Sequence, residues 1–253
     1  MKKYLGILAI VLLVAVLFAG CTEEPAVEDP GTDDPGTEEP TTTYVDGTWE
    51  GHSITDPTGD NASVGVATIT VVGGEITEAD YYEHQVGKAT AKDESYNWPQ
   101  YFEAIESISD QIVETQDPES IDVISEATST SNKFIEAINI AIENSTTTNT
   151  FYNGTYFAKA EPDDHGYYAV AYVTFEDDEV TNVLYEERSE EDDEAKVEGE
   201  YGHDEYFEAV EELSQQIMDT QDVEELDVIA EATSTSEKFA DLMEDIFAQA
   251  SVE

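Results

Sequence analysis

The sequence contains a long internal repeat, and this feature restricts its fold more than any other. Residues 122–134 return almost unchanged as residues 227–239, at an offset of 105 residues. Tyr101–Ala104 returns as Tyr206–Ala209 at the same offset, and no gap interrupts the alignment between these stretches. A repeat of roughly a hundred residues is long enough to form a folded unit. The chain is therefore expected to contain two copies of one small domain.

The earlier parts of the two copies align more loosely. Asp46–Trp49 corresponds to Asn153–Tyr156. We expect the first domain at residues 44–143 and the second at residues 151–253, since a constant offset marks repeated structural units. Residues 144–150 are rich in Ser, Thr and Asn and are the expected joint between them.

Each copy contains a predicted β-hairpin. Val64–Val72 is rich in β-branched residues, Gly73 and Gly74 provide a tight turn, and Ile76–Tyr82 runs back. The second copy repeats this pattern with Tyr168–Phe175 and Val180–Tyr185 on either side of Asp177 and Asp178.

Two helices are predicted after each hairpin. In the first copy, Asn97 is a suitable cap and Pro99 a suitable first-turn residue, and apolar residues follow at helical spacing. A second helix is expected to begin near Thr130 or Ser131 and to bury Phe134. Antiparallel strands followed by helices favour an α+β fold, with two tandem copies of an antiparallel sheet flanked by helices.

The first residues are typical of an export signal with a lipid attachment site. Lys2 and Lys3 precede an apolar run at Leu5–Phe18, so residues 1–20 are the expected signal peptide. The residues before Cys21 resemble the bacterial lipobox, in which the cysteine receives a diacylglyceryl group. Cys21 is the only cysteine, so no disulfide can form within the chain. An ordinary cleaved signal with an incidental cysteine is the alternative.

An acidic spacer and a strongly acidic composition follow this segment. Residues 21–43 are rich in Pro, Thr, Asp and Glu and have little to bury, which predicts a solvated linker. The whole chain has 60 acidic and 9 basic residues, a formal net charge of −51. A surface of this charge repels polyanions, so nucleic acid is excluded as a partner.

A short motif lies between the two predicted helices of each copy, at residues 122–131 and 227–236. Here, and in the order of elements around it, the sequence resembles the FMN-binding domain family, whose signature is Asp, two residues, Ser or Thr, Gly, Ala, Thr. The resemblance covers nearly all of each copy. The chain departs from the signature at Glu126 and Glu231, which replace the glycine, and at Ala230, which replaces Ser or Thr.

The resemblance implies that a separate FMN transferase joins FMN through its phosphate to the threonine after the alanine. By position these threonines are Thr128 and Thr233, so up to two covalent FMN groups are expected per chain. The cofactor-binding positions implied with them are Asp122, Ser125, Ala127, Lys133, Asp227, Ala232 and Lys238.

The residues themselves make this placement reasonable. A phosphate on a hydroxyl at the start of a helix lies beside unpaired backbone N–H groups, at the positive end of the helix dipole. Lys133 and Lys238 lie just beyond and are candidate phosphate partners. The simpler alternative is that the Ser and Thr run only caps a helix. Positive φ at the family's glycine would make glutamate unfavourable there.

The histidines do not follow the repeat. His52, His84, His165 and His203 have no matching positions and no metal-ligand spacing, so they are interpreted as surface residues and no metal site is predicted. No Ser-His-Asp arrangement, phosphate loop or dinucleotide fingerprint is present, so no catalytic residue is proposed.

Together these features predict an electron carrier anchored by its lipid to the outer face of the cytoplasmic membrane and exposed outside the cell. It would take electrons from a membrane donor and pass them to an extracellular acceptor. The alternative from another class is a flavin-free surface binding or structural module that retains the fold. A reductase of a soluble acceptor is a third possibility.

Overall fold

The computed structural model describes residues 43–59, 62–87 and 90–252. The predicted signal peptide, Cys21 and all of the predicted spacer except Thr43 lie outside the described residues. We call residues 43–144 the first half and residues 151–252 the second half.

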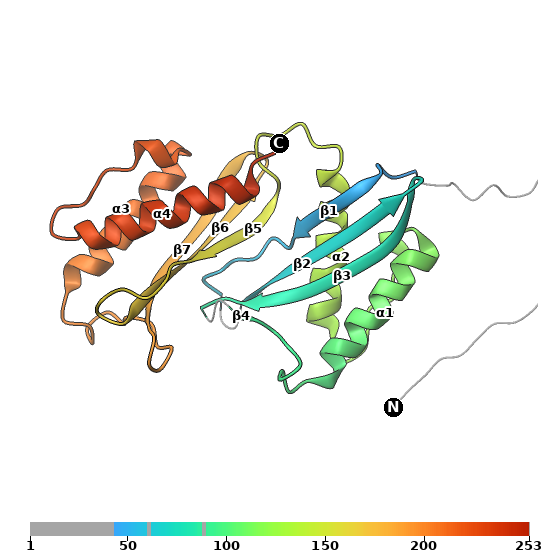
Figure 1. Ribbon diagram of the computed structural model, residues 1–253, viewed down its shortest axis with the longest axis horizontal. Coiled ribbons are helices and arrows are strands. Elements are labelled where there is room, and N and C mark those ends of the chain that lie inside the picture. The colour runs from blue at the N-terminus through green and yellow to red at the C-terminus, as the bar shows by residue number, and fades with distance from the viewer. Residues whose placement is uncertain (1–42, 60–61, 88–89, 253) are drawn as a thin grey trace, which may run out of the picture. The chain divides into compact units, whose positions relative to one another are not determined.

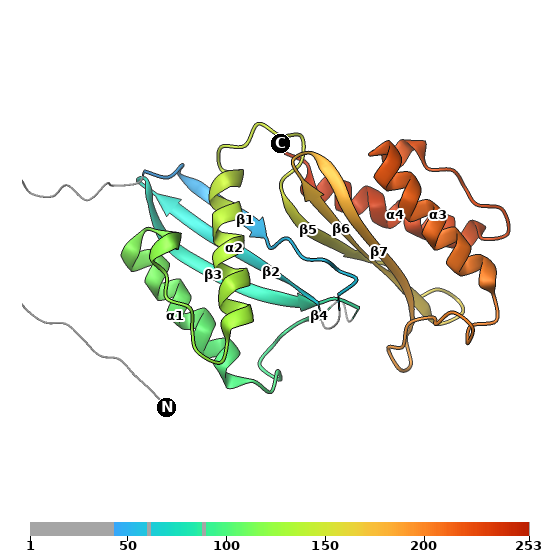
Figure 2. The same ribbon diagram turned by 180° about the vertical axis from the view of Figure 1, so that it is seen from behind.

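The first half is an antiparallel sheet covered on one face by two helices, as Figures 1 and 2 show. The sheet has the order β1-β2-β3-β4, with α1 against β3 and α2 across β1 and β2. The elements are β1 (Gly47–His52), β2 (Ser63–Val72), β3 (Glu75–Gln85), β4 (Thr90–Ala91), α1 (Pro99–Thr115), the short 3-10 helix η1 (Pro118–Ser120) and α2 (Thr128–Asn144).

The second half has the same order of elements, except that its described residues include no strand corresponding to β4. Its sheet has the order β5-β6-β7, and α3 and α4 pack on it as α1 and α2 do in the first half. The elements are β5 (Gly154–Lys159), β6 (Tyr167–Glu176), β7 (Glu179–Ser189), α3 (Asp204–Thr220), the short 3-10 helix η2 (Val223–Glu225) and α4 (Thr233–Ala250). The predicted α+β class with antiparallel sheets is therefore confirmed.

Both predicted hairpins are present, with strands longer than the sequence indicated. Gly73 and Gly74 connect β2 to β3 with φ of 66° and 84°, the left-handed region that this kind of two-residue turn requires. Asp177 and Asp178 make the same turn between β6 and β7 with φ of 51° and 67°. Aspartate tolerates this region better than most residues because its short side chain can bond locally. The Asp178 carboxylate also accepts hydrogen bonds from the backbone N–H groups of Thr150 and Phe151, in the segment before β5.

The predicted helix starts need two corrections. The N-cap of α1 is Trp98 rather than Asn97, although Pro99 does occupy the first turn. The last helix of the first half begins at Thr128, two residues before the earliest predicted start, and α4 begins at the matching Thr233. Both threonines are therefore the first residue of a helix rather than part of the loop before it.

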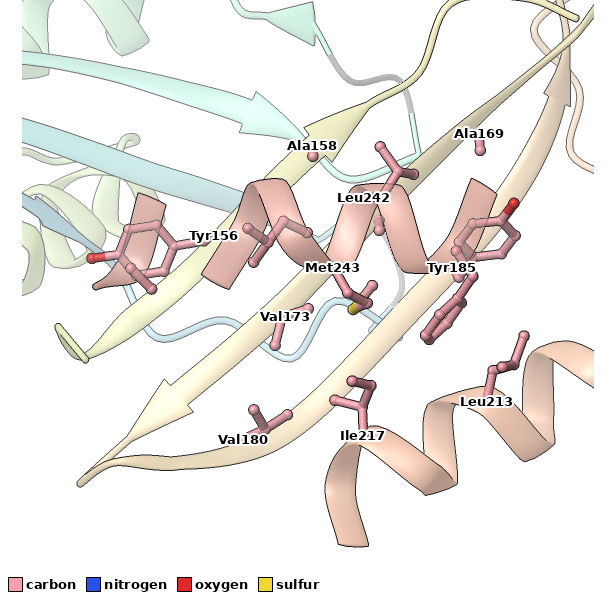
Figure 3. Close-up of a cluster of buried hydrophobic side chains, with 14 of the residues drawn as sticks. Tyr156, Ala158, Ala169, Val173, Val180, Tyr185, Leu213, Ile217, Leu242 and Met243 are labelled. Carbon is pink, nitrogen blue, oxygen red and sulfur yellow. The ribbon is translucent and has the colours of Figure 1, made fainter. Parts of the chain in front are cut away.

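Each half has its own apolar core between sheet and helices. In the second half, Leu242 and Met243 of α4 and Leu213 and Ile217 of α3 form one buried cluster with Val173 and Tyr185 of the sheet (Figure 3). In the first half, Phe134 of α2 is completely buried and stacks on Tyr81 with ring centroids 4.3 Å apart. The helix face that carries Phe134 is thus the one that the sequence predicted to be buried.

The opposite faces of the two sheets also bury apolar residues against each other. A third cluster joins β2 to β6 and contains Val64, Val66, Tyr168, Val170 and Tyr172. Hydrogen bonds cross the same boundary, among them one from the Thr55 N–H to the Thr155 hydroxyl at 2.9 Å. The residues that the structure describes include no helix with the length and hydropathy needed to cross a membrane.

Candidate functional site

The segment before α2 is a tight loop held by side chains from both helices. The backbone N–H of Asp122 donates to Gln111 Oε1 on α1 at 2.7 Å. Ser131 Oγ on α2 accepts from the Ile124 N–H at 3.1 Å and donates to the Ala127 carbonyl at 2.9 Å. Because Ser131 is completely buried, its hydroxyl fixes the loop rather than meeting solvent. The loop therefore has one shape, set by packing.

The second half holds its loop in the same way. The N–H of Asp227 donates to Gln216 Oε1 at 2.8 Å. Ser236 Oγ accepts from the Ile229 N–H at 3.0 Å and donates to the Ala232 carbonyl at 3.0 Å. The repeated Ser that ends the motif is thus a loop-fixing residue in both halves.

The glutamates that replace the family's glycine have positive φ. Glu126 has φ of 67° and Glu231 has φ of 71°, so the backbone takes the left-handed conformation that glycine adopts at no steric cost. A side chain there costs about 1 kcal/mol or slightly more. In the first half Glu126 accepts two long hydrogen bonds. Trp98 Nε1 donates to the Glu126 carbonyl at 3.3 Å, and Gln100 Nε2 donates to the Glu126 carboxylate at 3.4 Å.

Both predicted attachment threonines are exposed. Thr128 and Thr233 are the first residues of α2 and α4, and the hydroxyl residues that follow them, Ser129 and Ser234, are exposed too. The N-cap residues are Ala127 and Ala232, and within the described residues neither helix has a side-chain cap. The Ser and Thr run therefore does not cap its helix, and the first N–H groups of each helix are free to bind an anion.

The other predicted motif residues have different surroundings. Asp122, Ser125 and Asp227 are exposed, whereas Ala127 and Ala232 are buried, with 6% and 9% of their surface accessible. The small side chain of alanine lets the loop turn directly into the helix at that point.

A pocket borders Thr233 in the second half. It has a volume of about 400 Å³ and lies between the start of α4 and the segment that leads into α3. Its lining includes Glu231, Thr233, Ser234, Thr235, His165, Lys196, Tyr201, His203, Glu205 and Tyr206. Its volume lies in the range of roughly 300–1,000 Å³ that is typical of small-molecule sites, and its mostly polar lining includes two tyrosine rings.

Beneath each motif lies a buried ion cluster that sequence reasoning missed. In the first half, Glu83 on β3 is completely buried, and its carboxylate is 2.6 Å from Lys92 Nζ and 3.6 Å from Lys133 Nζ. In the second half, Glu187 on β7 is 2.6 Å from Lys196 and 3.2 Å from Lys238. The sheet sets this geometry, since the N–H of each first lysine donates to the carbonyl of its own glutamate partner.

The pKa values of these carboxylates follow from their partners. Burial alone would raise the pKa of Glu83, but Lys133, Lys92 and the Ser63 hydroxyl outweigh burial and hold that pKa below its ordinary value. Burial acts in the same way on Glu187, and Lys196 and Lys238 again lower its pKa. Both carboxylates are therefore charged at neutral pH.

The two lysines predicted as phosphate partners belong to these clusters. Besides Glu83, Lys133 donates to the Ser63 hydroxyl. Lys238 also donates to Asp163 Oδ2 at 2.7 Å. A role of Lys133 and Lys238 toward a phosphate stays a prediction, because each already has a carboxylate partner. The signal that could have revealed the clusters is the alternation Ala79, Tyr81, Glu83 along one strand, which places the glutamate on the inner face.

The interpretation of all four histidines as surface residues was wrong for two of them. His52 is 4% exposed and stacks on Tyr156 with ring centroids 4.2 Å apart. His84 is half-buried against Phe157, with ring centroids 3.9 Å apart. Both are placed by contacts between the two halves, which no local pattern reveals. His165 and His203 are exposed, as expected.

Comparison with protein families finds a match, which lies in the first half. Residues 61–143 match the FMN-binding domain family. This match contains the whole motif with Thr128, the buried Glu83 and both of its lysines. None of the curated proteins matches this chain.

Two solved structures are similar to part of the chain. The crystal structure of the CPE2226 protein from Clostridium perfringens is 28% identical over 40% of this chain and 88% of its own, with a TM-score of 0.37. A solution structure of a protein from Clostridium thermocellum is 19% identical over 40% of this chain and 92% of its own, with a TM-score of 0.30.

The residues present fit FMN. An exposed hydroxyl at an uncapped helix start provides a place for a phosphoester. In the second half the adjoining pocket supplies tyrosine rings and a lysine, which suit a flat, electron-accepting ring. In the first half, Gln100 Oε1 beside Glu126 is buried and has no hydrogen-bond partner among the described residues, so this carboxamide can serve a bound ring.

Proposed function

We propose that this chain is a membrane-anchored extracellular electron carrier made of two tandem copies of the FMN-binding domain. FMN would be joined by a phosphoester bond to Thr128 in the first copy and to Thr233 in the second. The observation that carries this proposal is the exposed threonine at the uncapped start of a helix in both halves, beside a pocket in the second.

Each part of the site has a separate role in this proposal. The threonine hydroxyl is the attachment point, and the free N–H groups of the first helical turn bind phosphate oxygens. Ser131 and Ser236 keep the loop in one shape, so the hydroxyl is presented to the FMN transferase in a fixed position. When bound, FMN supplies the redox chemistry by accepting and releasing electrons, while the protein provides position and electrostatics.

The proposed route of electrons runs from a membrane donor to an extracellular acceptor. Cys21 would carry the lipid, and residues 21–43 would hold the folded part away from the outer face of the cytoplasmic membrane. Replacing Cys21 with serine is expected to move the chain from the membrane fraction to the soluble fraction, and to abolish incorporation of labelled fatty acid. Retention of the lipid label in C21S would contradict the anchor.

Mass spectrometry of the chain co-expressed with a cognate FMN transferase tests the attachment. The intact mass is expected to rise by two FMN groups, each less one water, and the protein to show a flavin absorption spectrum. Thr128→Ala and Thr233→Ala are each expected to lose one increment, and the double variant both.

Neighbouring hydroxyls provide matched controls for this experiment. Ser129→Ala and Ser234→Ala remove equally exposed hydroxyls one residue later in the same helices. Both increments are expected to remain in these variants. An unmodified wild-type chain, or increments that survive in the threonine double variant, would refute covalent attachment at these positions.

A flavin-free surface module is the second candidate. Glu126 and Glu231 favour it, because they place a negative charge and a strained backbone beside the site where the family has glycine. Under this alternative, Glu126→Gly with Glu231→Gly would restore modification to a chain that is unmodified as wild type.

A further inference from the structure

The Lys196 ammonium in the second half is shielded from solvent by its neighbours. Its side chain is only 6% exposed, and its Nζ lies 2.6 Å from Glu187. Three tyrosine rings surround the same Nζ, with ring centroids at 4.7 Å for Tyr167, 4.2 Å for Tyr201 and 4.6 Å for Tyr206. Cations are attracted to the faces of aromatic rings, and more strongly when water is excluded.

This lysine is also part of the wall of the pocket that contains Thr233. In a chain with a net charge of −51, the pocket wall thus contains a fixed positive charge. Glu187 and Asp163 together balance the charges of Lys196 and Lys238, so removal of the Lys196 charge would leave this cluster with a net negative charge. A cation with few water contacts acts on its neighbours through a low effective dielectric, so salt screens it weakly.

The first half has a matching lysine. Lys92 Nζ is 2.6 Å from Glu83 and lies 4.8 Å from the ring centroid of Tyr96 and 5.1 Å from that of Tyr101. Its side chain is 10% exposed. The same arrangement of one glutamate, one lysine and tyrosine rings therefore accompanies both attachment threonines.

We propose that Lys196 and Lys92 are positioning charges that raise the reduction potential of the flavin attached to their own half. This inference rests on the proposed function. Two electrons from the membrane donor and one proton leave the oxidised ring with one added negative charge, which a fixed cation stabilises. The glutamate and the tyrosines hold each lysine in place, and the lysine itself takes no part in proton transfer.

The test measures the midpoint potential of a single flavin. In a Thr128→Ala chain, only the flavin on Thr233 remains. Lys196→Met in this background is expected to make the equilibrium constant for reduction at least tenfold less favourable, which for a two-electron couple is about 30 mV lower. Lys196→Arg, which keeps the charge, is expected to restore most of the potential.

Lys159 provides the matched control. Lys159→Met removes the same charge from the surface of the second half, where Lys159 lies 4.0 Å from the ring centroid of Tyr168 and does not line the pocket. The flavin of the Lys159→Met chain is expected to have the same midpoint potential as the flavin of the parent Thr128→Ala chain. Lys92→Met in a Thr233→Ala chain repeats the test in the first half, and answers the question if Lys196→Met fails to fold.

The outcomes separate this inference from the function on which it rests. Flavin bound at Thr233 with an equal potential in the Lys196→Met and Lys159→Met chains would overturn the role of the lysine and leave the carrier intact. A parent chain without flavin mass would overturn the carrier and, with it, this inference.

Discussion

The two halves share one scaffold but surround their proposed attachment threonines differently. Trp98 lies beside the first motif and His203 at the matching position in the second. Lys133 pairs with a hydroxyl and Glu83, whereas Lys238 pairs with two carboxylates, Asp163 and Glu187. The repeat therefore preserves the backbone of the site and varies its charge.

The pKa values of Lys133 and Lys238 shift in opposite directions, in line with this difference in charge. Burial and Lys92 lower the pKa of Lys133, with Glu83 opposing them. The pKa of Lys238 is raised, because the hydrogen bond that it donates to Asp163 and the attraction by Glu187 outweigh burial. The pKa of Asp163 falls to about 2, since Lys238 and the N–H groups of Tyr167 and His165 outweigh burial. The second cluster is thus closer to neutral than the first among the described residues.

The largest expected effect comes from removing the buried carboxylates. Glu83→Gln leaves Lys92 and Lys133 without an acidic partner, and is expected to lower the free energy of unfolding by about 3–5 kcal/mol. Glu187→Gln is expected to cost less, because Lys238 keeps Asp163. Urea unfolding measures both, and tryptophan fluorescence reports the first half, since Trp49 and Trp98 both lie there. An equal loss in the free energy of unfolding for both variants would contradict the proposed difference between the two clusters.

A second difference concerns how closely each helix lies on its sheet. A Cβ on Gly51 of β1 would be 2.2 Å from the Ala137 carbonyl oxygen and 2.4 Å from the Ala141 nitrogen of α2, whereas β5 has Ala158 at the matching position. Gly51→Ala is expected to destabilise the chain by about 1–3 kcal/mol through overpacking. Ala158→Gly is expected to cost about 0.5–1 kcal/mol. Thermal unfolding of both variants checks the order.

The charge difference predicts two distinct potentials. With only Thr128 loaded, the flavin is expected to have a midpoint potential about 30 mV above that of a chain with only Thr233 loaded, a tenfold change in the equilibrium constant. Asp163→Asn is expected to reduce this gap by removing one negative charge near Lys238. Potentials that stay unequal by the same amount in that variant would assign the gap to Trp98 and His203 instead.

Relief of backbone strain gives a smaller effect. Glu231→Gly is expected to stabilise the chain by about 1 kcal/mol, because glycine takes φ of 71° without steric cost. Glu126→Gly is expected to gain less, since it also loses the contact from Gln100. Alanine at either position serves as the control and should give no gain, because it retains a Cβ. Stabilisation by alanine would mean that charge, and not φ, is the cause.

The smallest effect is a pH dependence that only the first half should show. Burial, with His52 nearby, lowers the pKa of His84 from 6.5 to about 4. Between these values the unfolded chain binds more protons, so stability is expected to fall as pH drops from 6.5 toward 4. After allowance for solvent screening the loss is on the order of 1 kcal/mol. His84→Phe should remove this part of the slope in urea titrations, and an unchanged slope would disprove it.

The sequence predicted the elements well because their signals are local. Alternating apolar residues, Gly73-Gly74 and Pro99 identify hairpin and helix within a few residues. The buried Glu83 was not found, because a carboxylate is usually exposed and its lysine partners lie on other segments. The helix start at Thr128 was placed two residues late, since a polar run does not reveal that Ala127 ends the loop. Tertiary contacts decide both features.

The cluster that joins β2 to β6 limits how the chain can be shortened. Val66 and Val170 are completely buried, and both lie in the apolar cluster between the two sheets. A fragment that ends at residue 145 is expected to expose this apolar surface and to self-associate. A protein with only one such domain would need polar residues on the same face of its sheet. The second half therefore has two expected roles: it provides a further proposed attachment threonine, and it covers an apolar face of the first half.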